Sequence, residues 1–142
     1  MATTAEIHRQ MSDAWNRRDF AAIRNLLHDE YIYTGGDGQP HSGPDAGMAI
    51  AQGYAGAFGD GRLEVRKVYT QGDTAIAEMV ARGTHTGDLM GLAPTGRSVE
   101  LTICNIIELR DGKIYREREY MDMLTLMAQL GVATTPGRAA GA

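Results

Sequence analysis

Two long strand-like runs that meet at a tight turn constrain the fold of this chain more than any other feature. The first run, Ser98 to Arg110, alternates apolar and polar residues, and the second, Lys113 to Tyr120, follows directly after Asp111-Gly112. An Asp-Gly pair between two such runs is a strong local signal for a β-hairpin, because both residues tolerate a positive φ. The sequence therefore predicts an antiparallel pair of strands in the C-terminal half.

The remaining elements follow the order helices first and strands later. Apolar residues at helical spacing predict helices over Thr4 to Asn16, Phe20 to Leu27, Ala46 to Phe58 and Asp122 to Gln129. Further strands are predicted over Tyr31 to Thr34, Leu63 to Tyr69 and Thr74 to Thr86. This order is typical of an α+β fold with an antiparallel sheet. We expect a curved, cone-shaped sheet that packs against the N-terminal helices and encloses a pocket.

Length and charge limit the possible classes of protein. A chain of 142 residues with a net charge of -4 is expected to form one domain, over residues 1–132, with a flexible tail at 133–142. The acidic balance argues against nucleic acid and anionic membranes as partners. No run of about 18 apolar residues and no signal peptide occur, so a cytoplasmic location is expected. The histidines and the lone cysteine lack metal-ligand spacing, so no metal site is expected.

Strand parity brings three polar side chains of the hairpin to one face. In the second run Glu117 and Glu119 share a face, and in the first run Asn105 lies among apolar residues on a single face. An apolar wall raises the pKa of a carboxyl group toward neutrality, which suits a general base, and Asn105 would be placed to hydrogen-bond an enolate oxygen. The alternative is that both glutamates are solvated and paired with Arg82 or Arg97.

Two further residues are candidates for acid–base chemistry. Asp122 opens the last predicted helix, where it would serve either as an N-cap or as a pocket carboxylate. His85 lies at a strand-to-loop junction, and its ordinary pKa of about 6.5 suits proton transfer; the alternative is a structural histidine in the turn.

Three aromatic residues are candidates for lining the pocket. Tyr31 and Tyr33 flank Ile32, so their side chains share a face, and Trp15 ends the apolar stripe of the first helix. Each would contact a ligand or simply pack in the core.

Four short motifs stand out after residue 80: Gly83-Thr84-His85-Thr86-Gly87, Pro94-Thr95-Gly96-Arg97, Asp111-Gly112-Lys113-Ile114 and Gln129-Leu130-Gly131. Together they resemble the SnoaL-like polyketide cyclases, a family within the nuclear-transport-factor-two-like superfamily. The resemblance implies an acidic residue on the strand after the hairpin that removes a proton from an activated carbon, after which an intramolecular aldol reaction closes a ring. It also implies that neither a metal nor an organic cofactor takes part.

The resemblance assigns the role of general acid–base to Glu119. Many family members have a histidine two residues earlier, where this chain has Glu117, and some have a second histidine on the preceding strand, near Asn105. The hypothesis is therefore a cyclase with Glu119, Asp122 and His85 as catalytic residues. Asn105, Glu117, Tyr31, Tyr33 and Trp15 would contact the substrate, a small hydrophobic carbonyl compound.

Two other functions remain open at this stage. The first is an epoxide hydrolase or a double-bond isomerase, in which Arg116 or Arg118 would join Asp122. The second is a noncatalytic binding or dimerisation module. A homodimer or a higher homo-oligomer is expected, because proteins of this superfamily often associate through an exposed sheet face.

Overall fold

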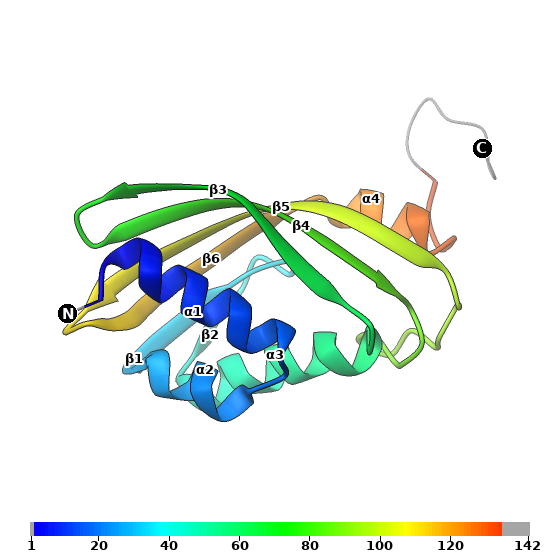
Figure 1. Cartoon of the computed structure of the whole chain (residues 1–142). Coiled ribbons are helices and arrows are strands. Elements are labelled where there is room, and N and C mark those ends of the chain that lie inside the picture. Colours follow the sequence, from blue (N-terminus) through cyan, green and yellow to red (C-terminus); the bar gives the residue numbers. More distant parts are fainter. Residues whose placement is uncertain (1, 135–142) are drawn as a thin grey trace.

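The structure, a computed structural model, describes residues 2–134. It contains four helices and six strands (Figure 1). The helices are α1 (Thr4–Asn16), α2 (Phe20–Leu26), α3 (Pro44–Ala57) and α4 (Met123–Gln129). The strands are β1 (Leu27–Thr34), β2 (Pro40–Ser42), β3 (Arg62–Gln71), β4 (Thr74–Thr84), β5 (Ser98–Arg110) and β6 (Lys113–Met121). The tail predicted at 133–142 lies, from residue 135 onward, outside the described residues.

All six strands form one sheet in the order β2-β1-β6-β5-β4-β3. The predicted hairpin is confirmed: β5 and β6 pair antiparallel, and Asp111 and Gly112 adopt positive φ values of 53° and 74°. The sheet differs from the expectation in two respects: the short strand β2 was not predicted, and β1 pairs with β6 in parallel. A parallel neighbour becomes possible here because a long stretch of chain separates the two strands. The sheet is therefore mixed.

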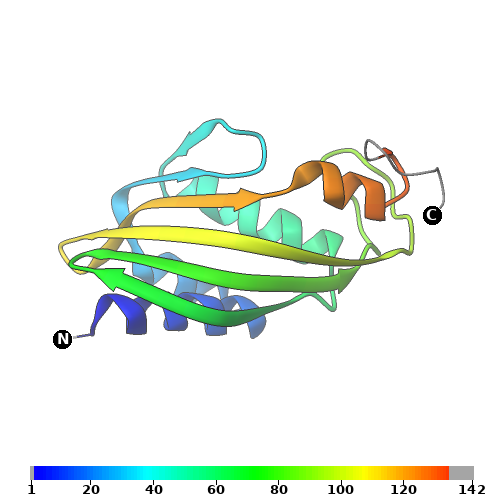
Figure 2. The same ribbon diagram turned by 90° about the horizontal axis from the view of Figure 1, so that it is seen from above.

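The helices and the curved sheet form two layers. Helices α1, α2 and α3 lie on the concave side of the sheet, and α4 follows the end of β6 (Figures 1 and 2). Side chains cap the N-termini of the first two helices: Thr3 and Glu6 form a capping box on α1, and Asp19 caps α2. The α+β class with a cone-like sheet is thus confirmed.

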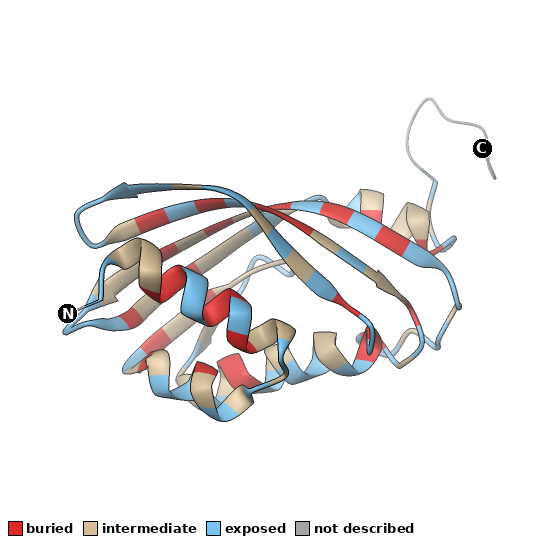
Figure 3. Cartoon of the chain, viewed as in Figure 1, coloured by how far each residue is buried: buried red, intermediate tan, exposed pale blue. Residues whose placement is uncertain are grey.

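The core lies between the two layers. On β4 the residues Ala75, Ala77 and Met79 are almost fully buried, whereas the alternating residues Ile76 and Glu78 are exposed (Figure 3). This alternation shows which face of the sheet the helices cover. No helix in the described part of the chain is long and apolar enough to cross a membrane.

Candidate active site

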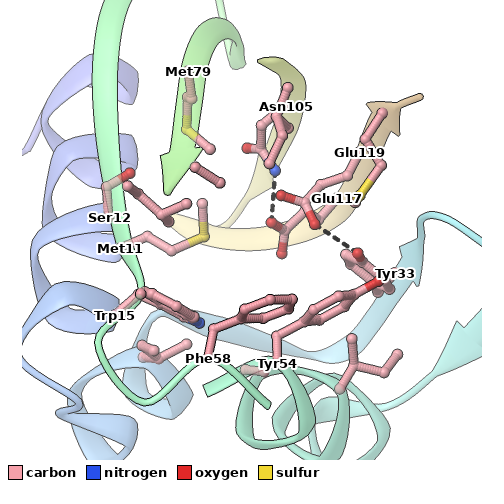
Figure 4. Close-up of a pocket in the computed structure, with 18 of the residues that line it drawn as sticks. Met11, Ser12, Trp15, Tyr33, Tyr54, Phe58, Met79, Asn105, Glu117 and Glu119 are labelled. Atoms are coloured by element: carbon pink, nitrogen blue, oxygen red, sulfur yellow. Dashed lines mark hydrogen bonds between the residues drawn. The ribbon is translucent and has the colours of Figure 1, made fainter. Parts of the chain in front are cut away.

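A cavity of about 150 Å³ lies between the helices and the concave face of the sheet. Most of its wall is apolar and comes from both layers, including Met11, Trp15, Tyr54, Phe58 and Met79 (Figure 4). The polar part of the wall is small and comes mainly from the sheet. It includes Tyr31 and Tyr33 of β1, Asn105 of β5, and Glu117 and Glu119 of β6; Arg62, Arg82 and Ser12 of α1 also line the cavity.

Strand pairing brings these polar side chains together. Asn105 lies directly opposite Glu119 in the β5·β6 register, so both point to the concave face. In the parallel β1·β6 pair, Tyr33 lies beside Glu117. The hydroxyl of Tyr33 reaches Glu119, two residues further along β6, and the hydroxyl of Tyr31 reaches Glu117. The shared face predicted for the two glutamates and Asn105 is therefore present.

Glu119 accepts a hydrogen bond of 2.6 Å at Oε1 from the hydroxyl of Tyr33. Its side chain is partly buried and lines the cavity. The alternative of two solvated glutamates paired with Arg82 or Arg97 does not hold: Glu117 is buried, the guanidinium of Arg82 contacts Glu64 and Glu100, and no ion pair among the described residues joins Arg97 to either glutamate.

Glu117 is held on both carboxylate oxygens. The hydroxyl of Tyr31 donates to Oε1 at 2.6 Å, and Nδ2 of Asn105 donates to Oε2 at 2.8 Å. The oxygen of the Asn105 side chain lies 2.8 Å from Nε2 of His8, which is fully buried. Since an amide oxygen only accepts hydrogen bonds, Nε2 of His8 carries the proton. A directed chain thus runs from His8 through Asn105 to Glu117.

Burial and charge separate the two carboxyl groups. Desolvation first, and the nearby charge of Glu117 second, raise the pKa of Glu119 from 4.5 to about 7. The opposing influence of Tyr33 and of the Asn105 amide on this pKa is smaller. Desolvation also lowers the pKa of His8, in agreement with a neutral ring. Glu119 is therefore the carboxyl group whose protonation state changes near neutral pH.

The two tyrosines remain protonated donors. Burial, together with the neighbouring carboxylates, holds the pKa of Tyr31 and that of Tyr33 well above the ordinary value of 10. Gly47 of α3 allows Tyr31 its position, since a Cβ atom there would lie 2.3 Å from the tyrosine ring. A helix glycine thus helps to orient the side chain that holds Glu117.

Two of the predicted catalytic residues lie away from the cavity wall. Asp122 is exposed and caps α4, accepting hydrogen bonds from the backbone N–H and the hydroxyl of Thr125. His85 is fully buried, and its Nδ1 accepts from the backbone N–H of Thr95. Its ring packs against that of Phe58, with the ring centroids 5.6 Å apart. Of the two roles considered for Asp122, N-cap and pocket carboxylate, it therefore has the first.

The other predicted residues line the cavity. Trp15 does so from α1, and the guanidinium of Arg18 lies over its ring at 4.1 Å. No separate sequence signal marks His8 and Ser12, because one helical turn of a mostly apolar stripe does not show which polar residue turns inward. Among the described residues no group of three or more His, Cys, Asp or Glu could hold a metal ion.

Comparison with known proteins places this geometry in a family. The model of the SnoaL-like polyketide cyclase family matches residues 5–130. The chain belongs to this family. It is 30% identical over 134 residues to the aklanonic acid methyl ester cyclase DnrD of Streptomyces peucetius, covering 92% of each chain. It is also 27% identical over 123 residues to the nogalonic acid methyl ester cyclase of Streptomyces nogalater, covering 85% of this chain and 92% of the relative.

Solved structures agree with this family assignment. IdmH of Streptomyces antibioticus, a candidate polyketide cyclase, superposes with a TM-score of 0.79 at 29% identity, covering 92% of this chain and 100% of IdmH. A SnoaL-like protein of Jannaschia sp. CCS1 has a TM-score of 0.85 at 20% identity, covering 93% of each chain, which shows the shared fold. The resemblance first seen in four short motifs thus extends over nearly the whole chain.

Proposed function

We propose that this protein catalyses the intramolecular aldol cyclisation of a polyketide by acid–base catalysis, with Glu119 as the proton carrier. The single observation that carries the proposal is the state of Glu119. It lines an apolar cavity, it is oriented by Tyr33, and its pKa is raised to about 7. A base with such a pKa is substantially ionised at neutral pH and still returns its proton readily.

The proton balance of the reaction needs only this one group. Ionised Glu119 takes a proton from a carbon activated by neighbouring carbonyl groups, which leaves an enolate. The enolate carbon then attacks a second carbonyl of the same molecule, so a carbon–carbon bond forms and the attacked carbonyl becomes an alkoxide. Protonated Glu119 returns the proton to that alkoxide, which restores the ionised base. No group leaves, so the product is an isomer of the substrate.

Glu117 and Asn105 support this step without moving a proton. Both oxygens of Glu117 already accept hydrogen bonds, from Tyr31 and from Asn105, so neither oxygen is free to contact the substrate. Its charge raises the pKa of Glu119. The Asn105 amide lies opposite Glu119 and is held in one orientation by His8, which suits it to stabilise the developing enolate oxygen.

The geometry gives less support to epoxide hydrolysis. The hypothesis from the sequence joins Arg116 or Arg118 to Asp122, but Arg118 extends from β6 to Glu108, away from the cavity wall formed by Glu117 and Glu119. Asp122, the other member of the set, caps α4.

Purified protein incubated with aklanonic acid methyl ester, and separately with nogalonic acid methyl ester, tests the proposal. Chromatography with mass detection should show a product of unchanged mass and altered retention. The Glu119→Gln variant should lower kcat by about 100-fold or more, since it removes the base with little change in shape. Asp122→Asn, which alters a carboxylate outside the cavity, is the matched control and should keep kcat within about twofold. Equal turnover by Glu119→Gln and wild type would refute the role of Glu119.

A further inference from the structure

Ser12 is a polar residue in the cavity wall that no internal partner satisfies. It lies on α1, only 3% of its surface is exposed, and it lines the cavity. Its hydroxyl oxygen is buried and makes no hydrogen bond with any of the described residues. The backbone carbonyl four residues earlier, a common acceptor for a helical serine, is not used either.

Such a hydroxyl group is unfavourable for the empty protein. Burying it without a partner costs about 1–3 kcal/mol, and alanine has a higher helix propensity at the same position. The two flanking wall residues on α1, Met11 and Trp15, are apolar or aromatic and offer no compensating contact. A polar group that weakens the folded state at a cavity wall is best explained by a partner that enters the cavity.

The position of Ser12 defines which part of a ligand it would meet. Figure 4 shows Ser12 on the α1 side of the cavity, and Glu119 across the cavity on β6. The wall between them is formed largely by apolar side chains such as Met11, Met79 and Phe58. A flat ring system whose reacting carbon lies at Glu119 therefore extends toward Ser12.

We propose that Ser12 is an oxygen-binding subsite, which forms a hydrogen bond with a carbonyl or hydroxyl group at the end of the ligand remote from Glu119. The placement of the reacting carbon rests on the proposed function, whereas the subsite itself rests on the unpartnered hydroxyl group. The ligand class is an oxygenated polycyclic compound rather than a hydrocarbon or a terpene without oxygen at that end. A serine hydroxyl both donates and accepts, so it recognises either a ketone or a phenol.

A binding experiment with two probes tests this subsite without any turnover. The probes are emodin, a three-ring compound with oxygen on every ring, and phenanthrene, a three-ring hydrocarbon. Ser12→Ala should weaken the binding of emodin by about fivefold and leave that of phenanthrene unchanged. Ser12→Thr, which keeps the hydroxyl group, should retain emodin binding. Ser42→Ala, which changes a serine on the exposed strand β2, is the control and should have no effect.

Thermal unfolding of the ligand-free variants excludes a purely structural role. Ser12→Ala should unfold at the same temperature as wild type or higher, because it removes an unsatisfied hydroxyl group. A lower unfolding temperature for Ser12→Ala, equal emodin binding by Ser12→Ala and wild type, or no binding of emodin to wild type would each overturn the subsite.

The two proposals fail in different ways. If Glu119→Gln abolishes cyclisation while Ser12→Ala changes neither emodin binding nor KM, the subsite is wrong and the proposed function stands. If Ser12→Ala weakens emodin binding while no ester is cyclised by wild type, the subsite stands and the proposed function is wrong.

Discussion

Glu117 and Glu119 are two residues apart on one strand, yet their surroundings give them different chemistry. Glu117 accepts hydrogen bonds at both oxygens, from Tyr31 and from Asn105. Glu119 receives one such bond, from Tyr33, and faces the cavity. When two carboxyl groups lie close together, the better-solvated or better-bonded one ionises first and raises the pKa of the other. The difference between the two residues is therefore a property of their partners.

The raised pKa of Glu119 has a measurable effect on stability. In the unfolded chain this carboxyl group has its ordinary pKa of 4.5, and in the folded protein the pKa is about 7. Between these values the folded state binds more protons, so the free energy of unfolding decreases as pH rises. Glu119→Gln removes this decrease. The difference in unfolding free energy, variant minus wild type, should increase by at least about 1 kcal/mol between pH 4.5 and pH 7.5.

Urea denaturation of both proteins at several pH values provides this measurement. The comparison cancels the contribution of His8, which both proteins share. If the difference in unfolding free energy between variant and wild type does not change with pH, Glu119 is not held in a desolvated site.

Tyr33 tunes the same carboxyl group through its hydroxyl. Its hydrogen bond favours the ionised form of Glu119, so Tyr33→Phe should raise the pKa of Glu119 further. Because the ionised form is the base, the rise of kcat/KM with pH should move upward by about one pH unit. The control is Tyr120→Phe, which changes an exposed tyrosine on β6, the strand that carries Glu119. If the pH profile of kcat/KM were the same for Tyr33→Phe and wild type, the Tyr33 hydroxyl would have no influence on the group that titrates.

Strand parity predicts the residues that the hairpin contributes to this site, but not those contributed or excluded by the helices and loops. Alternation places Asn105, Glu117 and Glu119 on one face once the Asp111-Gly112 turn fixes the hairpin. The inward position of His8 depends on how α1 rotates against the sheet. Its apolar neighbours on the stripe do not determine that rotation to within one residue. His85 and Asp122 have the right side chains for acid–base chemistry, but the loop after β4 and the start of α4 hold them elsewhere.

At the level of elements, the helix α3 is fitted to β1 by one glycine. A Cβ atom on Gly47 would lie 2.3 Å from the ring of Tyr31, whereas a Cβ atom on Gly53 of the same helix would meet nothing within 4 Å. Alanine is the better helix former at both positions, by about 1 kcal/mol. Alanine substitutions at these two glycines therefore distinguish the effect of helix propensity on stability from the effect of packing.

Gly53→Ala should stabilise the protein by about 0.5–1 kcal/mol, since only helix propensity changes. Gly47→Ala should destabilise it by about 1–3 kcal/mol, because the new methyl group pushes Tyr31 away from Glu117. Chemical denaturation of the two variants measures both values. Equal stabilisation by the two substitutions would mean that α3 does not press on Tyr31.

The order of strands in the sheet lies beyond what local patterns show. The hairpin between β5 and β6 is local, and its turn residues predict it. The parallel pairing of β1 with β6 joins segments more than 80 residues apart, such as Tyr33 and Glu117. Alternation gives the inward face of each strand but not its neighbour. This pairing brings the two tyrosines to the two glutamates, so the site depends on a contact that the sequence alone did not predict.

At the scale of the whole molecule, the outer face of the sheet carries an exposed apolar row. Tyr69, Ile76 and Ile106 lie side by side across β3, β4 and β5, and Tyr69 and Ile76 are 45% and 38% exposed. Groups of both charges lie beside this row, such as Glu108 and Arg118. A surface with apolar residues and both charges is complementary to a second copy of itself about a twofold axis. We propose that this face forms a homodimer.

Light scattering at tens of micromolar protein should therefore give the mass of a dimer for wild type. Ile76→Lys places a charge in the middle of the apolar row and should weaken association by about tenfold or more, because a buried isoleucine contributes about 1.5–3 kcal/mol. Gln10→Lys, at an exposed position of α1 and away from this face, adds the same single charge and should leave the dimer intact. The cavity lies on the opposite side of the sheet, so emodin should bind wild type and Ile76→Lys equally. A monomeric wild type, or an Ile76→Lys variant that remains dimeric, would exclude this face as the interface.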